Sequence, residues 1–172
     1  YCPHDGHVNP LHLLRALQEG FSKHGGCYLP LSSIDQIQPL NSSGFELLSK
    51  GRQVASCERL VIAAGHGSVG LGQQVSIRIP IYPEQGQIIV TERSAEQLAY
   101  PTNMIRQTDE GTFMLGASAR DVGFNSETTT DTLQDIVRRC ASAFPHLRSL
   151  RIQRNWAALR IMTPDGFPVY SQ

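Results

Sequence analysis

The chain has 172 residues, and its 15 Lys and Arg side chains balance its 15 Asp and Glu side chains. This length is enough to bury a hydrophobic core and to form one or two small domains. The balanced charge argues against a general electrostatic attraction to nucleic acid or acidic lipid. No apolar run approaches the roughly 20 residues that span a bilayer, and no signal segment opens the chain.

The cysteines and histidines argue against a metal site. The four cysteines are scattered without a Cys-x-x-Cys pair, which favours reduced thiols and a cytoplasmic protein. The six histidines form no His-x-x-x-His cluster, so we expect no bound metal ion.

Both ends of the sequence resemble points at which a longer chain has been cut. The chain begins at Tyr1 without a methionine and stops at Gln172, in what resembles the start of another strand. We therefore expect an internal piece of a longer protein. Apolar surface that the remaining parts would cover is expected to cause self-association at high concentration.

The first half predicts a helix followed by short strands. Asn9 and Pro10 suit a helix start, and Gly25-Gly26 suits its end. Between them, apolar residues recur at helical spacing: Leu11, Leu14, Leu17 and Phe21. Strands are predicted over 27–31, 34–38 and 45–48, with turns at 41–44 and 50–51.

The run 60–64 is apolar throughout, which predicts a strand buried on both faces of a parallel sheet. It continues into Gly65-His66-Gly67-Ser68. Glycines there let the backbone approach a ligand, although a tight turn is the simpler interpretation. No GxGxxG fingerprint and no Walker lysine occurs in the sequence.

The second half predicts strands over 75–80 and 87–91, separated by a turn at 83–86. A hairpin joins 104–107 to 112–115 through Asp109-Glu110-Gly111. A helix capped by Thr130 and stopped by Pro145 has one apolar face, made of Leu133, Ile136, Val137, Cys140 and Phe144. A last strand over 150–159 is predicted to run into a loop.

Arg160 stands at the predicted exit of this last strand. A guanidinium group at such a place can bind a carboxylate through a two-pronged contact. It can equally pair with a nearby Asp or Glu, as most arginines have structural or solvated roles. The residues alone leave both interpretations open.

Four motifs in order resemble one known family. They are Asp5-Gly6-His7-Val8-Asn9-Pro10, the run from Leu60 to Gly65, Pro83-x-x-Gly86-Gln87, and the stretch from Trp156 to Pro168. Together they resemble the D-amino-acid-oxidase-like FAD-dependent oxidoreductases, which include glycine oxidase and the sarcosine oxidase β subunit. The residues of these motifs are most similar to those of the FAD subunits of opine oxidase, hydrogen cyanide synthase and D-hydroxyproline dehydrogenase.

The resemblance implies an α+β fold with part of a split FAD-binding domain and a substrate-binding domain on a mixed sheet. Residues 1–75 would belong to the FAD-binding domain, 76–155 to the substrate-binding domain, and 156–172 would return toward FAD. Ile34 would lie against the adenine of FAD. Ala63, Ala64 and Gly65 would pass close to the cofactor. The chain by itself is not expected to bind FAD tightly.

The resemblance also implies a chemistry. Arg160 matches the family arginine that holds the substrate carboxylate; Met104 stands near the position of a substrate tyrosine of glycine oxidase, with Arg106 beside it. No residue is assigned a catalytic role. The whole protein would oxidise the Cα–N bond of an amino acid or secondary amine, such as glycine, sarcosine, an opine or D-hydroxyproline, by hydride transfer to flavin.

The implied partners are an amine or amino-acid substrate and the other subunits of a hetero-oligomer. The chain alone is expected to be inactive. The alternative is a module without chemistry, which binds a small carboxylate or contacts another subunit.

Overall fold

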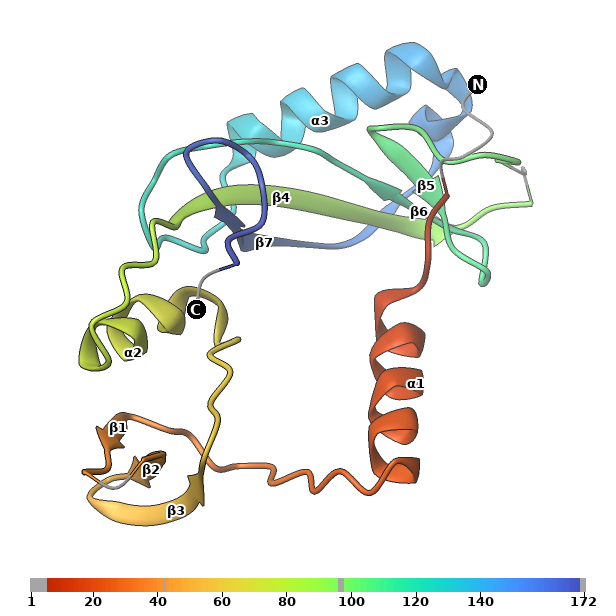
Figure 1. Cartoon of the computed structure of the whole chain (residues 1–172). Helices are drawn as coiled ribbons and strands as arrows, with labels where there is room; N and C mark the ends of the chain where they lie inside the picture. Colours follow the sequence, from red (N-terminus) through yellow and green to blue (C-terminus); the bar gives the residue numbers. More distant parts are fainter. Residues whose placement is uncertain (1–5, 42, 96–97, 171–172) are drawn as a thin grey trace. The chain divides into compact units, whose positions relative to one another are not determined.

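The computed structural model describes residues 6–41, 43–95 and 98–170. Two compact units divide the chain: Tyr1–Phe21 with Pro83–Arg160, and Ser22–Tyr82 with Ile161–Gln172. Both contain helices and antiparallel strands (Figure 1), which confirms the predicted α+β class. The unit boundary at Pro83 lies beyond the domain boundary predicted at residue 76, and the assignment of FAD and substrate binding to these parts stays a prediction.

Helix α1 covers Pro10–Lys23, as the sequence predicts. Asn9 caps it: the Asn9 Oδ1 atom accepts hydrogen bonds from the backbone N–H groups of Leu11 at 3.0 Å and His12 at 3.4 Å. None of the helix residues is buried within the described chain.

A small antiparallel sheet contains β1 (Gln36–Pro39), β2 (Phe45–Ser49) and β3 (Arg52–Cys57). The β2–β3 hairpin turns at Lys50 and Gly51, whose φ angles of 50° and 74° suit a two-residue turn. The strand predicted at 27–31 is wrong. Pro30 lacks an N–H group, and Leu31 has a φ of 59°, which does not fit a strand.

The predicted strand at 60–64 is also wrong. These residues belong to no strand, and Val61 is 86% exposed. An apolar run becomes a buried strand only beside another strand that completes its hydrogen bonds, and the described residues provide none there.

After this run, a 3₁₀ turn at Gly65–Gly67 leads into α2 (Ser68–Gln74), which the sequence did not predict. The strand predicted at 75–80 is wrong because this segment closes α2: the N–H groups of Val75 and Ile77 both donate to the Gly72 carbonyl. Gln74 joins α2 to β1, since its Oε1 accepts from the Ile37 N–H at 2.7 Å.

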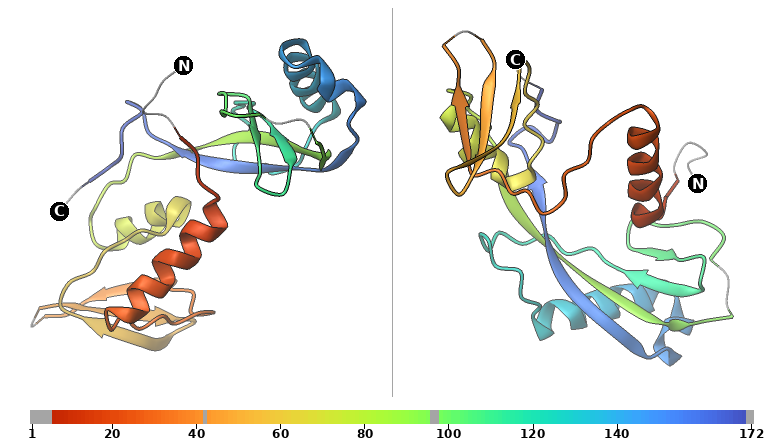
Figure 2. Two further views of the ribbon diagram at one scale, coloured as in Figure 1. Left: turned by 90° about the vertical axis from the view of Figure 1, so that its right-hand side faces the viewer. Right: turned by 90° about the horizontal axis from the view of Figure 1, so that it is seen from below.

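The larger sheet has the strand order β5-β6-β4-β7. Its members are β4 (Tyr82–Arg93), β5 (Ile105–Gln107), β6 (Thr112–Leu115) and β7 (Ile152–Met162). The β5–β6 hairpin is confirmed, and Gly111 turns it with a φ of 88°. Figure 2 shows β4 and β7 running side by side along the sheet.

Two sequence predictions for this sheet need correction. Residues 83–86 are not a turn but the beginning of β4, because Gln85 exchanges two backbone hydrogen bonds with Arg120 at 2.9 and 3.0 Å. Strand β7 extends to Met162, so Arg160 lies within a strand and not at its exit.

Helix α3 (Thr130–Ala143) covers one face of this sheet, and its predicted apolar face is confirmed. Thr129, not Thr130, is the cap position, and its side chain makes no capping bond. The turn Pro145–Ser149 follows the helix. Helix, sheet and turn share one buried cluster: Ile89, Ile105, Phe113, Leu115, Ile136, Cys140 and Leu147.

Candidate functional site

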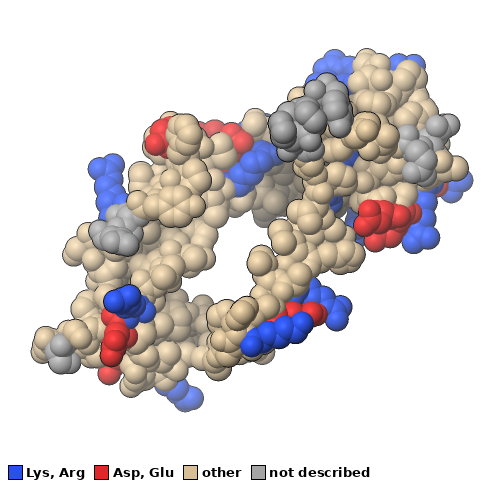
Figure 3. Space-filling view, turned by 45° about the vertical axis from the view of Figure 1, so that its right-hand side comes forward, with Lys and Arg blue, Asp and Glu red and all other residues tan. Residues whose placement is uncertain are grey.

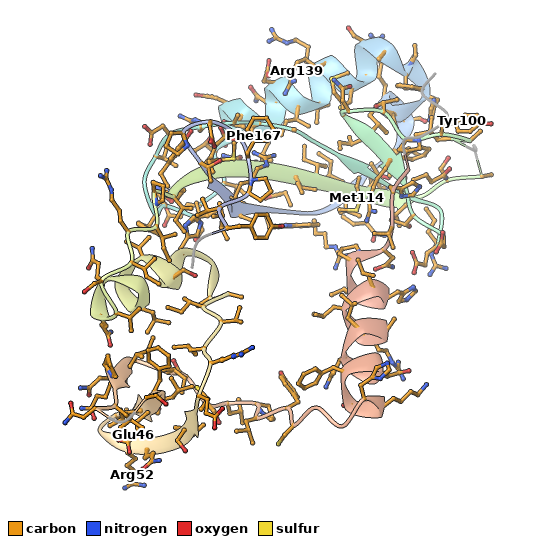
Figure 4. The ribbon with its side chains drawn as sticks, in the orientation of Figure 1. Glu46, Arg52, Tyr100, Met114, Arg139 and Phe167 are labelled. Carbon is orange, nitrogen blue, oxygen red and sulfur yellow. The ribbon has the colours of Figure 1, made fainter. Side chains whose placement is uncertain are left out.

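Helix α3 covers one face of the larger sheet, and the opposite face, which α3 does not cover, is called the open face below. Ile105 and Leu115 are directly paired, and both belong to the core beneath α3. Side chains alternate along a strand, so the neighbouring pair, Arg106 and Met114, lies on the opposite face. Figure 4 agrees: Met114 lies on the side of the sheet away from α3, which carries Arg139. Val90, the partner of Met114 in β4, lies on this same face, where its own side chain is buried.

Arg160 also lies on the open face. A Cβ atom built on Gly86 would meet the Arg160 guanidinium, and Gly86 has the same strand parity as Val90. Arg160 Nη1 donates to Glu84 Oε1 at 3.2 Å and to the Ser118 carbonyl at 2.8 Å. The Arg160 side chain is 40% exposed and that of Glu84 is 27% exposed. The arginine is therefore anchored at one nitrogen while much of it stays accessible.

A buried amide network fixes the segment that anchors Arg160. Gln87 Nε2 donates to Gln85 Oε1 at 2.9 Å, and Gln85 Nε2 donates to the carbonyls of Asn125 and Glu127. Gln87 also accepts from the Thr129 N–H through Oε1, at 3.1 Å. Both glutamines are buried, and these bonds satisfy their polar groups. The segment that follows β6 is thus held against β4.

Arg106 occupies a different surrounding. Its Nη1 donates to the Val8 carbonyl at 3.0 Å and lies 3.4 Å from His7 Nδ1. With Thr108 and other residues it lines a cavity of about 310 Å³, and Arg160 is not among the residues that line this cavity. The full lining is His7, Val8, Asn9, His12, Arg106, Thr108 and Asp109.

Met104 packs against the core beneath α3. Its backbone carbonyl accepts from the Gly116 N–H at 2.8 Å. The three residues predicted to bind substrate thus occupy three surroundings: Arg160 beside Glu84, Arg106 beside its cavity, and Met104 against the core.

The other unit brings most of the predicted cofactor residues together. Ile34, Ala63 and Ala64 line one cavity of about 740 Å³. Gly65 is not among its lining residues, but it follows Ala64 directly and has a φ of 59°. Most of its other lining residues are small or apolar, and four are polar: Ser32, Ser33, Asp35, Ile37, Leu47, Leu60, Val61, Ile62, Gly67, Gly70, Leu71 and Gln74.

The residue types that line this cavity have the chemistry that a flat aromatic ring with polar edges requires. Apolar side chains can pack against such a ring, while backbone groups and the Ser32, Ser33 and Asp35 side chains supply hydrogen-bonding groups in the lining. An adenine ring has this chemistry. The residues present therefore suit the part of FAD that the sequence resemblance places beside Ile34.

Other kinds of site find no support in the described part of the chain. His, Cys, Asp and Glu side chains form no group of three that could hold a metal ion there. Figure 3 shows Lys and Arg in separate groups interspersed with Asp and Glu, without one extended basic surface on the face in view. None of the described helices has the length and apolar character needed to cross a membrane.

Sequence reasoning did not find Glu84, Gly86 or Ser118. A signal was present for Gly86 alone, since it is the glycine of the Pro-x-x-Gly-Gln motif. It was interpreted as a turn because Pro and Gly mark turns, whereas a glycine inside a strand often marks a close approach of another group. Glu84 and Ser118 carried no sequence signal.

The comparison with protein families decides the assignment. Residues 1–172 match the model described as "FAD dependent oxidoreductase". The chain belongs to the FAD-dependent oxidoreductase family.

Within the FAD-dependent oxidoreductases, two relatives show the relationship. The chain is 34% identical to an opine oxidase subunit of Agrobacterium tumefaciens (strain Ach5), over 99% of this chain and 45% of that protein. It is 30% identical to hydrogen cyanide synthase subunit HcnC of Pseudomonas aeruginosa, over 98% of this chain and 41% of that protein. The chain thus spans less than half the length of these relatives.

Solved structures show the same fold. The chain is 25% identical to glycine oxidase from Geobacillus kaustophilus, with a TM-score of 0.85 over 98% of this chain and 46% of that one. The L-proline dehydrogenase from P. horikoshii matches in fold, with a TM-score of 0.88 at 20% identity, over 99% of this chain and 48% of that one. The resemblance to this oxidase family that the four motifs indicated is confirmed.

Proposed function

We propose that the full-length protein containing this chain oxidises the Cα–N bond of an amino acid or secondary amine, with FAD as the electron acceptor. The observation that carries the proposal is an anchored but accessible Arg160 on the open sheet face. The names of the relatives support it, because opine oxidase and glycine oxidase act on compounds with an amine and a carboxylate.

The role of Arg160 is to bind and orient the substrate. A guanidinium makes charge-assisted hydrogen bonds to a carboxylate, and a two-pronged contact fixes direction as well as position. With the carboxylate held, the Cα–H bond keeps one orientation, and orientation alone can supply a large part of a rate enhancement. Oxidation gives an imine, which water hydrolyses to a carbonyl compound and an amine.

We further propose that Ile34 contacts the adenine of FAD and that Ala63, Ala64 and Gly65 lie close to the cofactor. The first three line one cavity, which supports this placement. FAD supplies the electron acceptor for the reaction, whereas these residues bind and orient it. The chain alone is proposed to bind FAD weakly and to be inactive, since it spans under half of its relatives. A flavin absorbance spectrum tests this, and a stoichiometric yellow chain would contradict it.

Arg106 is proposed as a second contact for substrate, through the cavity beside His7 and His12. Met104 stays a proposed residue of the substrate site, although its side chain packs against the core beneath α3. The full-length protein is also proposed to assemble with other subunits, because two relatives are named as subunits. Size-exclusion chromatography of the protein purified from its native host, with mass spectrometry of co-purifying chains, tests this assembly.

A substrate screen tests the reaction itself. The full-length, FAD-loaded protein is incubated with glycine, sarcosine, D-hydroxyproline and an opine, and flavin bleaching is followed under anaerobic conditions. We expect at least one of these compounds to bleach the flavin, and the methyl ester of the same compound to react far more slowly. Equal rates for acid and ester would contradict carboxylate recognition.

A further inference from the structure

Gly86 of β4 lies directly beneath the guanidinium group of Arg160. A Cβ atom built on Gly86 would lie 2.6 Å from Nη2, 2.7 Å from Cζ and 2.8 Å from Nη1. Three atoms of one planar group at nearly equal distances indicate that the group lies flat on the strand. Real Cβ atoms essentially never approach other atoms so closely, so any side chain at position 86 must displace the guanidinium.

The hydrogen bonds of Arg160 use a single nitrogen. Nη1 carries two N–H groups, and two acceptors meet it: Glu84 Oε1 at 3.2 Å and the Ser118 carbonyl at 2.8 Å. Within the described chain, Nε and Nη2 make no hydrogen bond. The edge between Nε and Nη2 is therefore the one that can receive both oxygens of a carboxylate.

Ser118 is itself tied to the strand under Arg160. Its Oγ accepts a hydrogen bond from the Gln87 N–H at 2.8 Å, one residue beyond Gly86. The same short piece of β4 thus supplies the surface on which Arg160 lies and fixes one of its two acceptors. Glu84, two residues before Gly86, supplies the other.

We propose that Gly86 is a positioning residue for Arg160. The missing side chain lets the guanidinium lie flat, keeps Nη1 on Glu84 and Ser118, and leaves the Nε–Nη2 edge for the substrate carboxylate. The inference rests on the proposed role of Arg160 as the carboxylate-binding residue. It adds that the strength of carboxylate binding depends on a residue that does not itself contact the ligand.

The test is Gly86→Ala in the full-length protein, with acetate as the carboxylate probe. The methyl group meets the flexible end of an arginine, so the side chain tilts away while the fold persists. We expect the dissociation constant of acetate, measured by saturation-transfer NMR, to rise about tenfold or more, as two charged hydrogen bonds lose their alignment. The melting temperature is expected to change little.

Gly20→Ala is the matched control, because a methyl group there meets nothing within 4 Å and acetate binding should be unchanged. In an Arg160→Lys background, which keeps a cation but no planar guanidinium, Gly86→Ala should weaken acetate binding far less than in the wild type. An equal loss in that background would overturn the proposal, because Gly86 would then act through the fold and not through Arg160.

Two other outcomes separate this inference from the proposed function. If Arg160→Ala abolishes acetate binding while Gly86→Ala binds acetate as wild type, only the positioning role falls. If Arg160→Ala itself binds acetate normally, the role of Arg160 falls with it. Should Gly86→Ala fail to fold, Ser118→Ala replaces it: loss of the Oγ acceptor should weaken acetate binding in the same direction, and unchanged binding would overturn the proposal.

Discussion

Arg160 of β7 donates a hydrogen bond from Nη1 to Oε1 of Glu84 on β4, across 3.2 Å. The sequence left two interpretations of Arg160 open, and both apply to this side chain. It pairs with an acidic neighbour, while Nε and Nη2 make no hydrogen bond within the described residues. Water reaches both partners and screens their charges, so this pair holds the arginine only weakly. Such a contact orients Arg160 without removing it from ligand binding.

Glu84→Gln should therefore have little effect on folding. We expect the free energy of unfolding of this chain, measured by urea denaturation, to change by less than about 1 kcal/mol, as for other exposed ion pairs. Glu19→Gln, which removes the exposed partner of Arg15 on α1, is the matched control. A loss of several kcal/mol for Glu84→Gln alone would show a structural ion pair and would weaken the ligand-binding interpretation of Arg160.

Arg160→Ala should damage substrate binding in the full-length protein. The loss of a charged two-pronged contact is expected to raise the apparent KM for the carboxylate substrate by about 3 kcal/mol, roughly a hundredfold. Steady-state kinetics measures it. Arg138→Ala, on the exposed side of α3 with its side chain 78% exposed, is the control and should leave KM unchanged. An unchanged KM for Arg160→Ala would remove this residue from the site.

Gln87→Ala should loosen the segment that leads into α3. The Thr129 N–H donates to Gln87 Oε1 at 3.1 Å, and alanine offers no acceptor in its place. Hydrogen exchange at the Thr129 amide is expected to accelerate, by about tenfold or more for a lost bond of roughly 1.5 kcal/mol. The Gly111 amide, which donates to the Thr108 carbonyl in the β5–β6 turn, should exchange as before. Uniform acceleration at both amides would point to global destabilisation instead.

Ile136→Ala should destabilise the unit that contains α3. Ile136 is fully buried in the cluster between helix and sheet, so its truncation leaves a cavity and is expected to cost about 2–5 kcal/mol. Ile152→Ala on β7 makes the same chemical change at a side chain that is 51% exposed. Thermal unfolding should show a clear drop for the first variant and a small one for the second. Equal drops would contradict the placement of α3 on the sheet.

Cys140 should resist modification while the chain is folded. Burial raises the pKa of the Cys140 thiol, because a thiolate is poorly solvated in the core. Thiol labelling at pH 8 with peptide mapping is expected to modify exposed Cys27 and to spare Cys140 until denaturant is added. Rapid labelling of Cys140 in the native chain would show that α3 opens readily.

The raised pKa of Cys140 also determines how this group makes the stability of the fold depend on pH. The folded state holds the thiol proton more tightly than the unfolded state does. The contribution of this protonated thiol to the free energy of unfolding is therefore fully present below the ordinary thiol pKa. It is lost as the pH rises through the raised pKa of the folded state. Urea denaturation between pH 7 and pH 10 should show stability falling at the alkaline end, and a Cys140→Ala variant should show a smaller fall.

Local patterns were sufficient where an element completes its own interactions. Helix α3 carries a continuous apolar face, and the β5–β6 hairpin has a turn whose Gly111 adopts a positive φ, so both could be predicted. The run 60–64 has equally strong apolar character but no neighbouring strand among the described residues. The apolar composition of this run indicates that it can be buried. Whether it forms a strand depends on hydrogen bonds from a neighbouring strand.

Of the candidate site, the sequence predicted the residue that lies in a local motif but not its partners from distant positions. Arg160 could be found because a family motif surrounds it. Its partners Glu84 and Ser118 come from positions 76 and 42 residues away, and the pairing depends on the strand order of the sheet. Sequence spacing does not determine which strands become neighbours, so neither partner could be named in advance. Once β4 and β7 are adjacent, all three residues meet.

The two faces of strand β4 make different contacts. Gln85, Gln87 and Ile89 face the core and the segment before α3, whereas Glu84 and Gly86 face Arg160. A designer who wants to change ligand preference should therefore leave β4 alone, since a shift of its backbone would disturb both sides at once. Open-face positions on β7, such as Ala158, offer a safer starting point for a substitution library.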